Sequence, residues 1–274
     1  MKLNRIAAIA LGAAAVLTAS IATASHSWNN YHWARTGSSF TLQIIDSNTS
    51  NWDDELARAV SDWSKSTKLD MRVTSYNDAA STRQSCPMSA GKVRSCNYTY
   101  GNNGWLGLAS INLDSRGHIS QGTSKMNDSY STSFASQNQR WHVMCQELGH
   151  TIGLGHTSED GSSQNTCMDY STSSTSVSPN SHDYNQLASQ YGHTDSYNSY
   201  SLSSAASAAY VAPAQANARL APSQRAMMGN VPLGNRIKKG IFDEVYVAPD
   251  GKGGVYVTHV LLAPGFENTD LLGD

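Results

Sequence analysis

The segment QELGHTIGLGH, residues 146–156, decides how the rest of the chain is interpreted. Residues four apart lie on the same face of a helix, so Gln146 and His150 can point toward one metal ion, with Glu147 beside them. The glycines that follow allow the chain to leave the helix sharply, so that His156 turns back toward the same point. The segment therefore predicts a metal site with Gln146, His150 and His156 as ligands and Glu147 as a neighbouring base.

Three protein ligands and one water give the tetrahedral geometry of a catalytic zinc site. Zinc makes such a water nucleophilic near neutral pH and polarises a peptide carbonyl. Glu147 can then take the proton of the water and deliver it to the leaving amine. The predicted cofactor is one catalytic Zn²⁺ ion, and the predicted reaction is hydrolysis of a peptide bond.

Three interpretations of Gln146 remain open. Its amide oxygen can coordinate zinc, although a neutral carbonyl oxygen is a poorer zinc ligand than imidazole. His142 can replace it only if the helix breaks, because His142 and His150 are about 12 Å apart along a helix axis and zinc–nitrogen bonds are about 2 Å long. In the third interpretation no metal binds, and the domain only holds peptides or extracellular polymers.

ELGHTIGLGH, residues 147–156, followed downstream by Met168 and Tyr170, resembles the metzincin metalloproteases, and most closely their matrixin-like secreted bacterial branch. The resemblance covers about residues 28–195 and departs from the family at Gln146, where the family has histidine. It implies an α+β fold, with a twisted mixed sheet above the cleft, an active-site helix, and a Met-turn around Met168 beneath the zinc. In some branches a tyrosine placed like Tyr170 approaches the metal or the developing oxyanion, which implies a catalytic role for this residue.

The resemblance also implies the function. A metzincin of this branch is a secreted zinc endopeptidase that binds an extended peptide or protein along an edge strand, and YGNNGWLGLA (100–109) leads into the corresponding strand here. The expected protein is a monomer. The alternative is a catalytically weak or metal-free relative that binds peptides or extracellular polymers. A net charge of −2 and the lack of a basic run argue against nucleic acid as a partner.

The four cysteines predict two disulfides in an exported protein, with three ways to pair them. We prefer Cys86–Cys96, which closes a short loop, and Cys145–Cys167, which joins the helix of Gln146 directly to the Met-turn. A crossed pairing of the same four cysteines stays open.

Residues 1–24 predict a secretory signal peptide. Lys2 and Arg5 precede an Ala-rich apolar stretch, and Ala22-Thr23-Ala24 has the form of a cleavage site. The expected location is therefore extracellular, with no membrane attachment after cleavage.

Periodicity divides the remainder of the chain. Residues 25–195 form the predicted catalytic domain, 196–234 a Ser/Ala/Pro-biased linker, and 235–274 a C-terminal extension. Two alternating runs around a Gly-rich turn within the extension predict a β-hairpin that packs on the main domain or on a partner. Within the domain, strands are expected at 38–46, 69–76, 98–114 and 117–128, and helices at about 51–63, 136–154 and 182–193.

Other metal ligands are less well defined by the sequence. His32, His118, His182 and His193 could serve a second metal, although isolated histidines more often have structural contacts. Calcium has one weak candidate segment, SEDGSS (158–163), and no Asp-rich loop supports it.

Overall fold

The computed structural model describes residues 26–200 and 231–271. The predicted signal peptide with its cleavage site, and most of the predicted linker, lie outside these residues. Within the described ranges no helix is long and apolar enough to cross a membrane.

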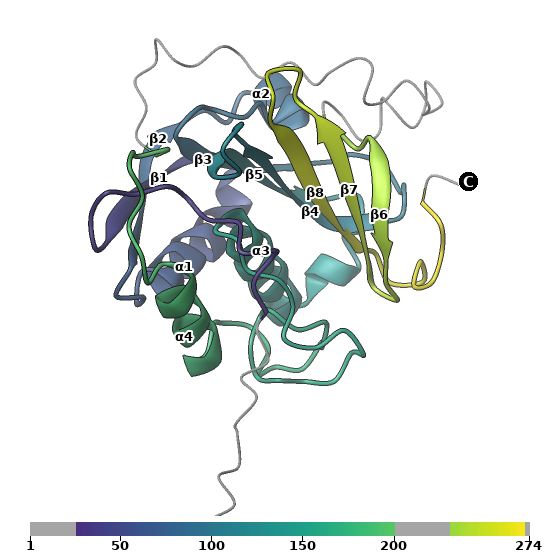
Figure 1. Cartoon of the computed structure of the whole chain (residues 1–274). Coiled ribbons are helices and arrows are strands. Elements are labelled where there is room, and N and C mark those ends of the chain that lie inside the picture. Colours follow the sequence, from purple (N-terminus) through teal and green to yellow (C-terminus); the bar gives the residue numbers. More distant parts are fainter. Residues whose placement is uncertain (1–25, 201–230, 272–274) are drawn as a thin grey trace, which may run out of the picture.

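The described residues form an eight-stranded mixed sheet, and the three longest helices lie on one side of it (Figure 1). The strand order is β2-β1-β3-β5-β4-β8-β7-β6. The strands are β1 (Phe40–Ser47), β2 (Leu69–Tyr76), β3 (Lys92–Tyr98), β4 (Trp105–Leu113), β5 (Ile119–Asn127), β6 (Asn235–Lys239), β7 (Asp243–Pro249) and β8 (Val255–Leu262). The α-helices are α1 (Asp53–Trp63), α2 (Ala80–Ser85), α3 (Gln137–Thr151) and α4 (Ser181–Gln190).

The two halves of the sheet differ in strand direction. β2, β1, β3 and β5 run parallel to one another, whereas β4, β8, β7 and β6 continue the sheet with antiparallel pairs. α1 contacts β2 and α3, and α3 contacts β4 and β5. The expected α+β class with a mixed sheet is confirmed, and the helix of the quoted segment lies under the middle of the sheet (Figure 1).

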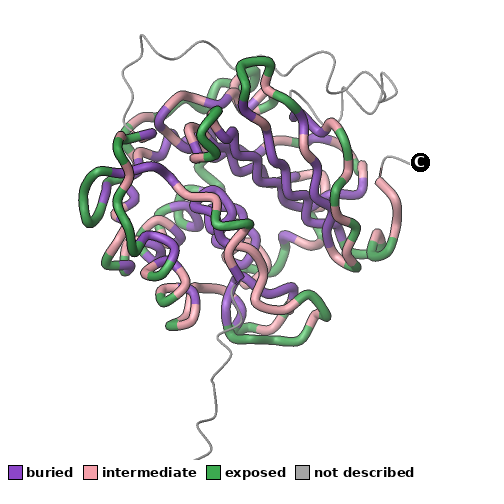
Figure 2. The backbone as a smooth tube through the Cα atoms, in the orientation of Figure 1, coloured by how far each residue is buried: buried purple, intermediate pink, exposed green. Residues whose placement is uncertain are grey.

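The core lies between the sheet and these helices. The apolar stripe of α1, with Leu56, Ala59 and Trp63, packs in the same cluster as Leu42 and Ile44, which alternate along β1. Figure 2 shows that the central strands and α3 are buried, while the connecting loops carry most of the exposed residues. Burial of both elements along their predicted faces explains why periodicity located them well.

β3 was missed in the sequence because two of its buried side chains, Ser95 and Asn97, are polar. It begins inside the loop expected between Cys86 and Cys96, continues to Tyr98, and pairs with β1 and β5. Ser95 accepts a hydrogen bond from Asn48 at 3.1 Å, and Asn97 accepts one from the Thr49 backbone at 2.6 Å. These bonds satisfy polar groups in the sheet, so the strand needs no apolar alternation.

The C-terminal strands continue the main sheet. The predicted hairpin is present as β7 and β8, and β8 pairs along β4, so the expected packing on the main domain is confirmed. β6 adds a further strand beyond β7. Val231 and Leu233, inside the stretch expected to be linker, are buried against the outer face of the sheet.

The expectation of a free edge strand after residues 100–109 is wrong. β4 pairs with β5 on one side and with β8 on the other, so its backbone N–H and C=O groups form hydrogen bonds with a neighbouring strand on both sides. The reason is the apolar alternation of β8, in which Val257 and Leu261 face the main core. Burying these side chains favours pairing with β4 over leaving that edge open.

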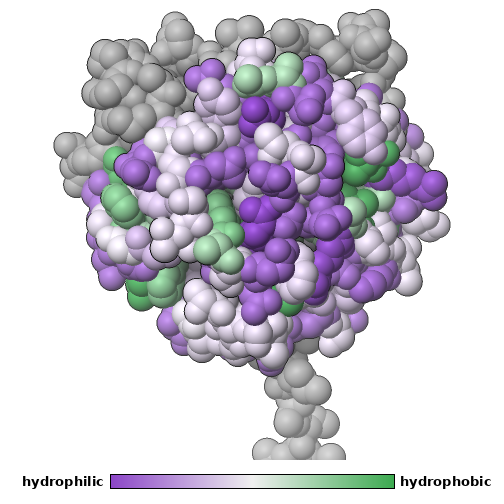
Figure 3. Space-filling view, turned by 180° about the vertical axis from the view of Figure 1, so that it is seen from behind, coloured by the Kyte–Doolittle hydropathy of each residue, from purple (hydrophilic) through white to green (hydrophobic). Residues whose placement is uncertain are grey.

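Both preferred disulfides, Cys86–Cys96 and Cys145–Cys167, are formed. Figure 3 shows the back of the molecule, where hydrophilic and neutral side chains predominate and apolar ones form small separate patches. That face therefore presents no broad apolar surface.

Candidate metal centre

Two histidines of the quoted segment meet a third from the C-terminal strands. His150 lies in the last turn of α3, His156 in the loop after it, and His259 in β8. One ring nitrogen of each lies within 4.8 Å of the others. We call these three residues the inner histidine cluster.

The end of α3 sets the path of the chain between His150 and His156. Gly153 has φ +88°, and a Cβ there would lie 1.7 Å from the carbonyl oxygen of Tyr31. Only glycine tolerates both conditions. The sharp exit expected at this glycine is therefore present, and it lets the loop return to the helix end.

In each ring of the inner histidine cluster, one nitrogen forms a hydrogen bond with an oxygen atom of the protein. Nδ1 of His150 lies 2.8 Å from the carbonyl oxygen of Leu154, and Nδ1 of His156 lies 2.8 Å from the hydroxyl of Tyr170. Nε2 of His259 lies 3.3 Å from the same hydroxyl. The second nitrogens of the three rings are buried and have no hydrogen-bond partner among the described residues. Unpaired buried polar atoms are costly, and metal-binding imidazoles are commonly held in this way by their other nitrogen, so the residues present fit a metal ion.

Glu147 lies beside these nitrogens. Its Oε2 is 3.7 Å from Nδ1 of His259, and neither carboxylate oxygen has a hydrogen-bond partner in the described chain. Gly107 of β4 permits this position, because a Cβ there would lie 2.4 Å from Oε1 of Glu147. Burial raises the pKa of Glu147, and the neighbouring His259 partly offsets that rise. A carboxylate with a raised pKa is a better proton acceptor for catalysis near neutral pH.

Asp243 and Lys238 support His259 from its other side. Oδ2 of Asp243 lies 3.5 Å from Nε2 of His259 and 3.0 Å from Nζ of Lys238. Burial alone would raise the pKa of Asp243, but its contacts with His259 and Lys238 hold that pKa well below its usual range. Burial likewise opposes protonation of His259, yet the carboxylates of Asp243 and Glu147 raise the pKa of this ring. A carboxylate behind an imidazole is the arrangement that orients metal-binding histidines in other proteins.

The other two rings are favoured in the neutral form. Burial lowers the pKa of His150 and that of His156 well below the usual value, and neighbouring rings add to the effect. Neutral imidazole is the form that binds a metal ion. In both rings the lowered pKa therefore favours the protonation state that metal coordination requires.

Gln146 is anchored to the turn around Met168. Its Nε2 donates hydrogen bonds to the carbonyl oxygens of Cys167 at 3.1 Å and Asp169 at 2.7 Å. Its Oε1 is buried and has no hydrogen-bond partner in the described chain. Coordination through that oxygen stays a prediction. His142, the other residue considered for this position, is buried with its Nδ1 2.6 Å from the carbonyl oxygen of Ser176.

The turn around Met168 lies directly against α3. Met168 is fully buried, and a Cβ on Gly149 would lie 2.5 Å from its sulfur. The Cys145–Cys167 disulfide joins the helix to the turn beside this contact. The ring of Tyr170 is tilted against that of His156, with the two ring centroids 4.1 Å apart. Its hydroxyl contacts the outer nitrogens of two rings, so it holds their orientation, and the expected approach to a metal or oxyanion stays a prediction.

The sequence interpretation missed His259 and Asp243. Both were assigned to an extension separate from the catalytic domain. A signal for His259 was present in VYVTHVLL, where it alternates in phase with Val257 and Leu261. A histidine among core-facing positions of a strand is unusual unless it has a partner there.

A cavity of about 210 Å³ reaches the inner histidine cluster. Trp28 forms part of its wall and packs edge-on against His150 at 5.5 Å. Glu159 and Lys238 also line this cavity. The centre is therefore accessible from outside through a passage with polar and aromatic sides.

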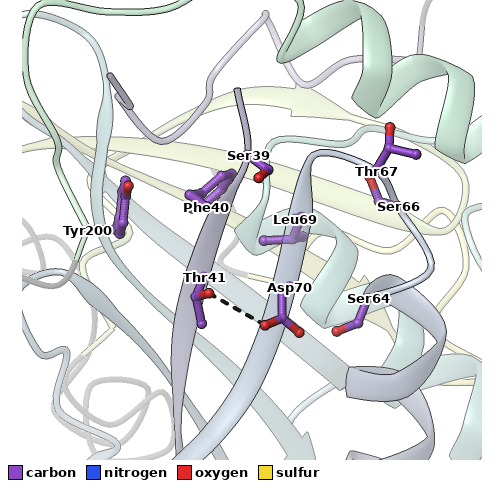
Figure 4. A pocket seen from close by; sticks show the side chains of 9 residues that line it. All are labelled: Ser39, Phe40, Thr41, Ser64, Ser66, Thr67, Leu69, Asp70 and Tyr200. Carbon is purple, nitrogen blue, oxygen red and sulfur yellow. Dashed lines mark hydrogen bonds between the residues drawn. The ribbon is translucent and has the colours of Figure 1, made fainter. Parts of the chain in front are cut away.

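A second hollow, near the starts of β1 and β2, has different chemistry (Figure 4). Its lining is mostly serine and threonine, and Thr41 donates a 3.4 Å hydrogen bond to its one carboxylate, Asp70. Since its lining contains no imidazole, it offers no comparable metal centre.

The remaining histidines gather in two further places. His32, His118 and His193 surround Asp195, and we call these four residues the outer histidine cluster. His182 stacks on His26 beside Asp183. In the candidate calcium segment, Asp160 accepts hydrogen bonds from Ser158 and Ser162 of its own loop, and calcium binding there stays a prediction.

The chain matches no family model and no curated protein. The resemblance to metzincins therefore rests on the residues of the sequence that carry it.

Proposed function

We propose that this protein is a metal-dependent peptidase that holds one zinc ion on His150, His156 and His259 and uses Glu147 as general base. The observation that carries the proposal is the convergence of three unpartnered imidazole nitrogens beside an unpartnered, buried carboxylate. Three protein ligands leave a position for water or substrate, as in catalytic zinc sites. A zinc ion bound there would polarise the substrate carbonyl and lower the pKa of the attacking water.

Glu147 takes a proton from the attacking water and delivers it to the leaving amine nitrogen. Its raised pKa suits both transfers, because the group must accept and then release a proton near neutral pH. Asp243 and the hydroxyl of Tyr170 hold the ring of His259 in place. Lys238 balances the charge of Asp243.

The proposal assigns the third ligand to His259 and gives Gln146 a positioning role. Imidazole is the stronger zinc ligand of the two groups. The amide nitrogen of Gln146 already bonds two carbonyl oxygens of the Met-turn. Gln146 therefore fixes the position of α3 relative to that turn.

The proposed substrate is a short or unstructured peptide segment. Pairing of β8 along β4 prevents a substrate from adding to β4 as an extra strand. The open route is the cavity of about 210 Å³, which is smaller than the roughly 300–1,000 Å³ of typical ligand pockets. It suits one or two residues of a flexible chain. The two disulfides and the predicted signal peptide support an extracellular place of action.

The test uses the chain without its predicted signal peptide. Zinc content is measured after dialysis, and cleavage is followed with a library of short fluorogenic peptides. Glu147→Gln should retain zinc and lower kcat/KM by about 10²–10⁴-fold, the usual contribution of a general base. Glu267→Gln, which changes an exposed carboxylate in the same way, is the matched control and should retain full activity.

A different result would favour the non-catalytic alternative. If the wild-type chain holds no zinc, and peptides bind equally to wild type and Glu147→Gln without being cleaved, the domain is a peptide-binding module. Equal cleavage by both proteins would instead remove Glu147 from the mechanism.

A further inference from the structure

A further group of possible metal ligands lies where the start of the described chain meets α4. Nε2 of His26 is 3.0 Å from Oδ1 of Asp183. The ring of His182 lies against that of His26, with the two ring centroids 4.5 Å apart. One ligand atom from each of the three residues lies within 4.8 Å of the other two. We call these three residues the α4 cluster.

The buried polar atoms of the α4 cluster are not hydrogen-bonded to one another. The side chains of His26 and Asp183 are only 2% and 0% exposed. Both ring nitrogens of His26, Nδ1 of His182 and Oδ1 of Asp183 are buried and have no hydrogen-bond partner among the residues that the structure describes. The contact between His26 and Asp183 is therefore a close approach without the alignment of a hydrogen bond. Because unpaired buried polar atoms are costly, this arrangement indicates that the atoms share a ligand.

The carboxylate of Asp183 is held in place by its other oxygen. Oδ2 accepts hydrogen bonds from the backbone N–H of Asn180, at 2.7 Å, and from the hydroxyl of Thr166. The bond from Asn180 is half of the capping box that begins α4. These two bonds leave Oδ1 directed toward His26. Carboxylates that bind metal ions are commonly fixed by hydrogen bonds in this way.

The residue types favour zinc over the other common divalent cations. Two imidazole nitrogens and one carboxylate oxygen suit zinc, whereas calcium and magnesium prefer oxygen ligands. Ligands of a tetrahedral zinc ion with bonds of about 2.0–2.1 Å lie about 3.3–3.4 Å from one another. The 3.0 Å contact between His26 and Asp183 is close to that separation. His182 is the one member of the cluster that is partly exposed, and a shift of its ring by no more than about 1.5 Å brings it to the same separation.

We propose that His26, His182 and Asp183 bind a zinc ion that anchors the N-terminal segment of the described chain to α4. Three protein ligands leave the fourth position of the tetrahedral shell to a water molecule. The site shares no residue with the inner or the outer histidine cluster. The proposal is therefore independent of the proposed peptidase activity.

The anchored segment, residues 26–28, pairs with the loop that leaves α3, residues 153–155. The backbone N–H of Gly155 donates a hydrogen bond to the carbonyl oxygen of His26 at 2.5 Å, and the N–H of Trp28 donates one to the same loop at 2.7 Å. This loop connects the end of α3 to the second histidine of the inner cluster. An ion bound to the α4 cluster therefore restrains the N-terminal segment and, through these backbone bonds, the loop.

The first experiment counts zinc ions in the full mature chain and in His182→Ala, each with and without His259→Ala, after saturation with zinc and removal of the unbound ion. Replacing His182 should lower the count by about one ion in both backgrounds. His182 is partly exposed, so its replacement leaves the core intact. Asn185→Ala, at an exposed position of the same helix, is the matched control and should keep the count of its parent chain. An unchanged count in His182→Ala would overturn the proposal, whether or not His259→Ala loses an ion.

Amide hydrogen exchange gives a second readout, which a merely structural role of His182 would not change. In the His259→Ala chain, zinc at 100-fold above Kd should slow exchange of the N–H groups of Trp28 and Gly155 by up to about 100-fold. The chain that carries both His182→Ala and His259→Ala should show no slowing when zinc is added. Equal slowing in the two chains, or none in the first, would contradict the proposal.

Discussion

The inner and outer histidine clusters contain the same kind of side chain but differ in how their carboxylate is placed. Each brings together three imidazoles from distant parts of the chain. In the outer cluster the carboxylate of Asp195 lies 3.2–3.6 Å from a nitrogen of all three rings. In the inner cluster the carboxylate of Glu147 pairs with His259 alone among the three rings, at 3.7 Å, and a cavity opens beside the cluster.

This difference affects what each carboxylate can do. A carboxylate surrounded by three imidazoles has its oxygens engaged by them, whereas one that pairs with a single ring can serve as a base for a water bound beside it. The two clusters also differ in exposure. The rings of His150 and His259 are almost fully buried and His156 is partly buried, while the side chain of His193 is 53% exposed. Access through a cavity, and not surface exposure, distinguishes the proposed catalytic centre.

The largest expected effect is on the third ligand of the inner cluster. His259→Ala should weaken zinc binding by more than about 100-fold, because it removes a ligand and not merely a group behind one. Gln146→Ala should weaken it by less than tenfold. Competition with a chelator measures both affinities. Thr258→Val, which changes the neighbouring residue on the opposite face of β8, is the control. A larger loss of zinc affinity in Gln146→Ala than in His259→Ala would show that Gln146, and not His259, is the third ligand.

A smaller effect is expected from the carboxylate behind His259. Asp243→Asn keeps the shape of the side chain but removes the charge that orients the ring. Zinc affinity should fall by about 10–100-fold, the usual cost of losing such a partner. The same titration measures it. An affinity equal to wild type would show that Tyr170 alone holds the ring.

The smallest effect concerns a buried cation that belongs to neither cluster. Lys125 of β5 is buried, its Nζ has no hydrogen-bond partner among the described residues, and it lies 5.0 Å from the ring of Tyr100. Burial lowers its pKa to about 7. Between that value and the unfolded pKa of about 10.4, the unfolded chain binds more protons, so the stability due to this group rises with pH.

Lys125→Met should therefore raise the free energy of unfolding at pH 7 and make this free energy depend less on pH. The difference in unfolding free energy between variant and wild type should shrink by roughly 1 kcal/mol per pH unit between about pH 8 and 9.5. Urea denaturation at several pH values measures it. Lys92→Met, at a less buried position of β3, should show no such trend. A difference that does not change with pH would mean that Lys125 stays charged in the folded state.

Local patterns located most of the elements on which the site stands. The strand expected at 69–76 has the bounds of β2, and the expected helix at 136–154 contains α3. Both carry apolar residues at the spacing of their secondary structure. The two disulfides were also predicted, because their cysteines flank segments that the fold must bring together.

The remainder depended on contacts that no local pattern records. β3 buries serine and asparagine, whose pairing with Asn48 and Thr49 is set by the neighbouring loop. His259 faces the core because β8 pairs with β4, a contact between distant parts of the chain. The outer histidine cluster likewise joins positions 32, 118 and 193, and only the assembled fold places them around Asp195.

The pairing of β8 with β4 also has a consequence for timing. In the proposed peptidase, two ligands come from α3 and its exit loop, but the third arrives with a strand made much later in translation. Until that strand docks, the centre has only two imidazoles and holds zinc weakly. Docking and metal uptake are thus one coupled event. A peptidase assembled in this order would have no complete zinc site during synthesis and export. It would become active only after β8 has docked.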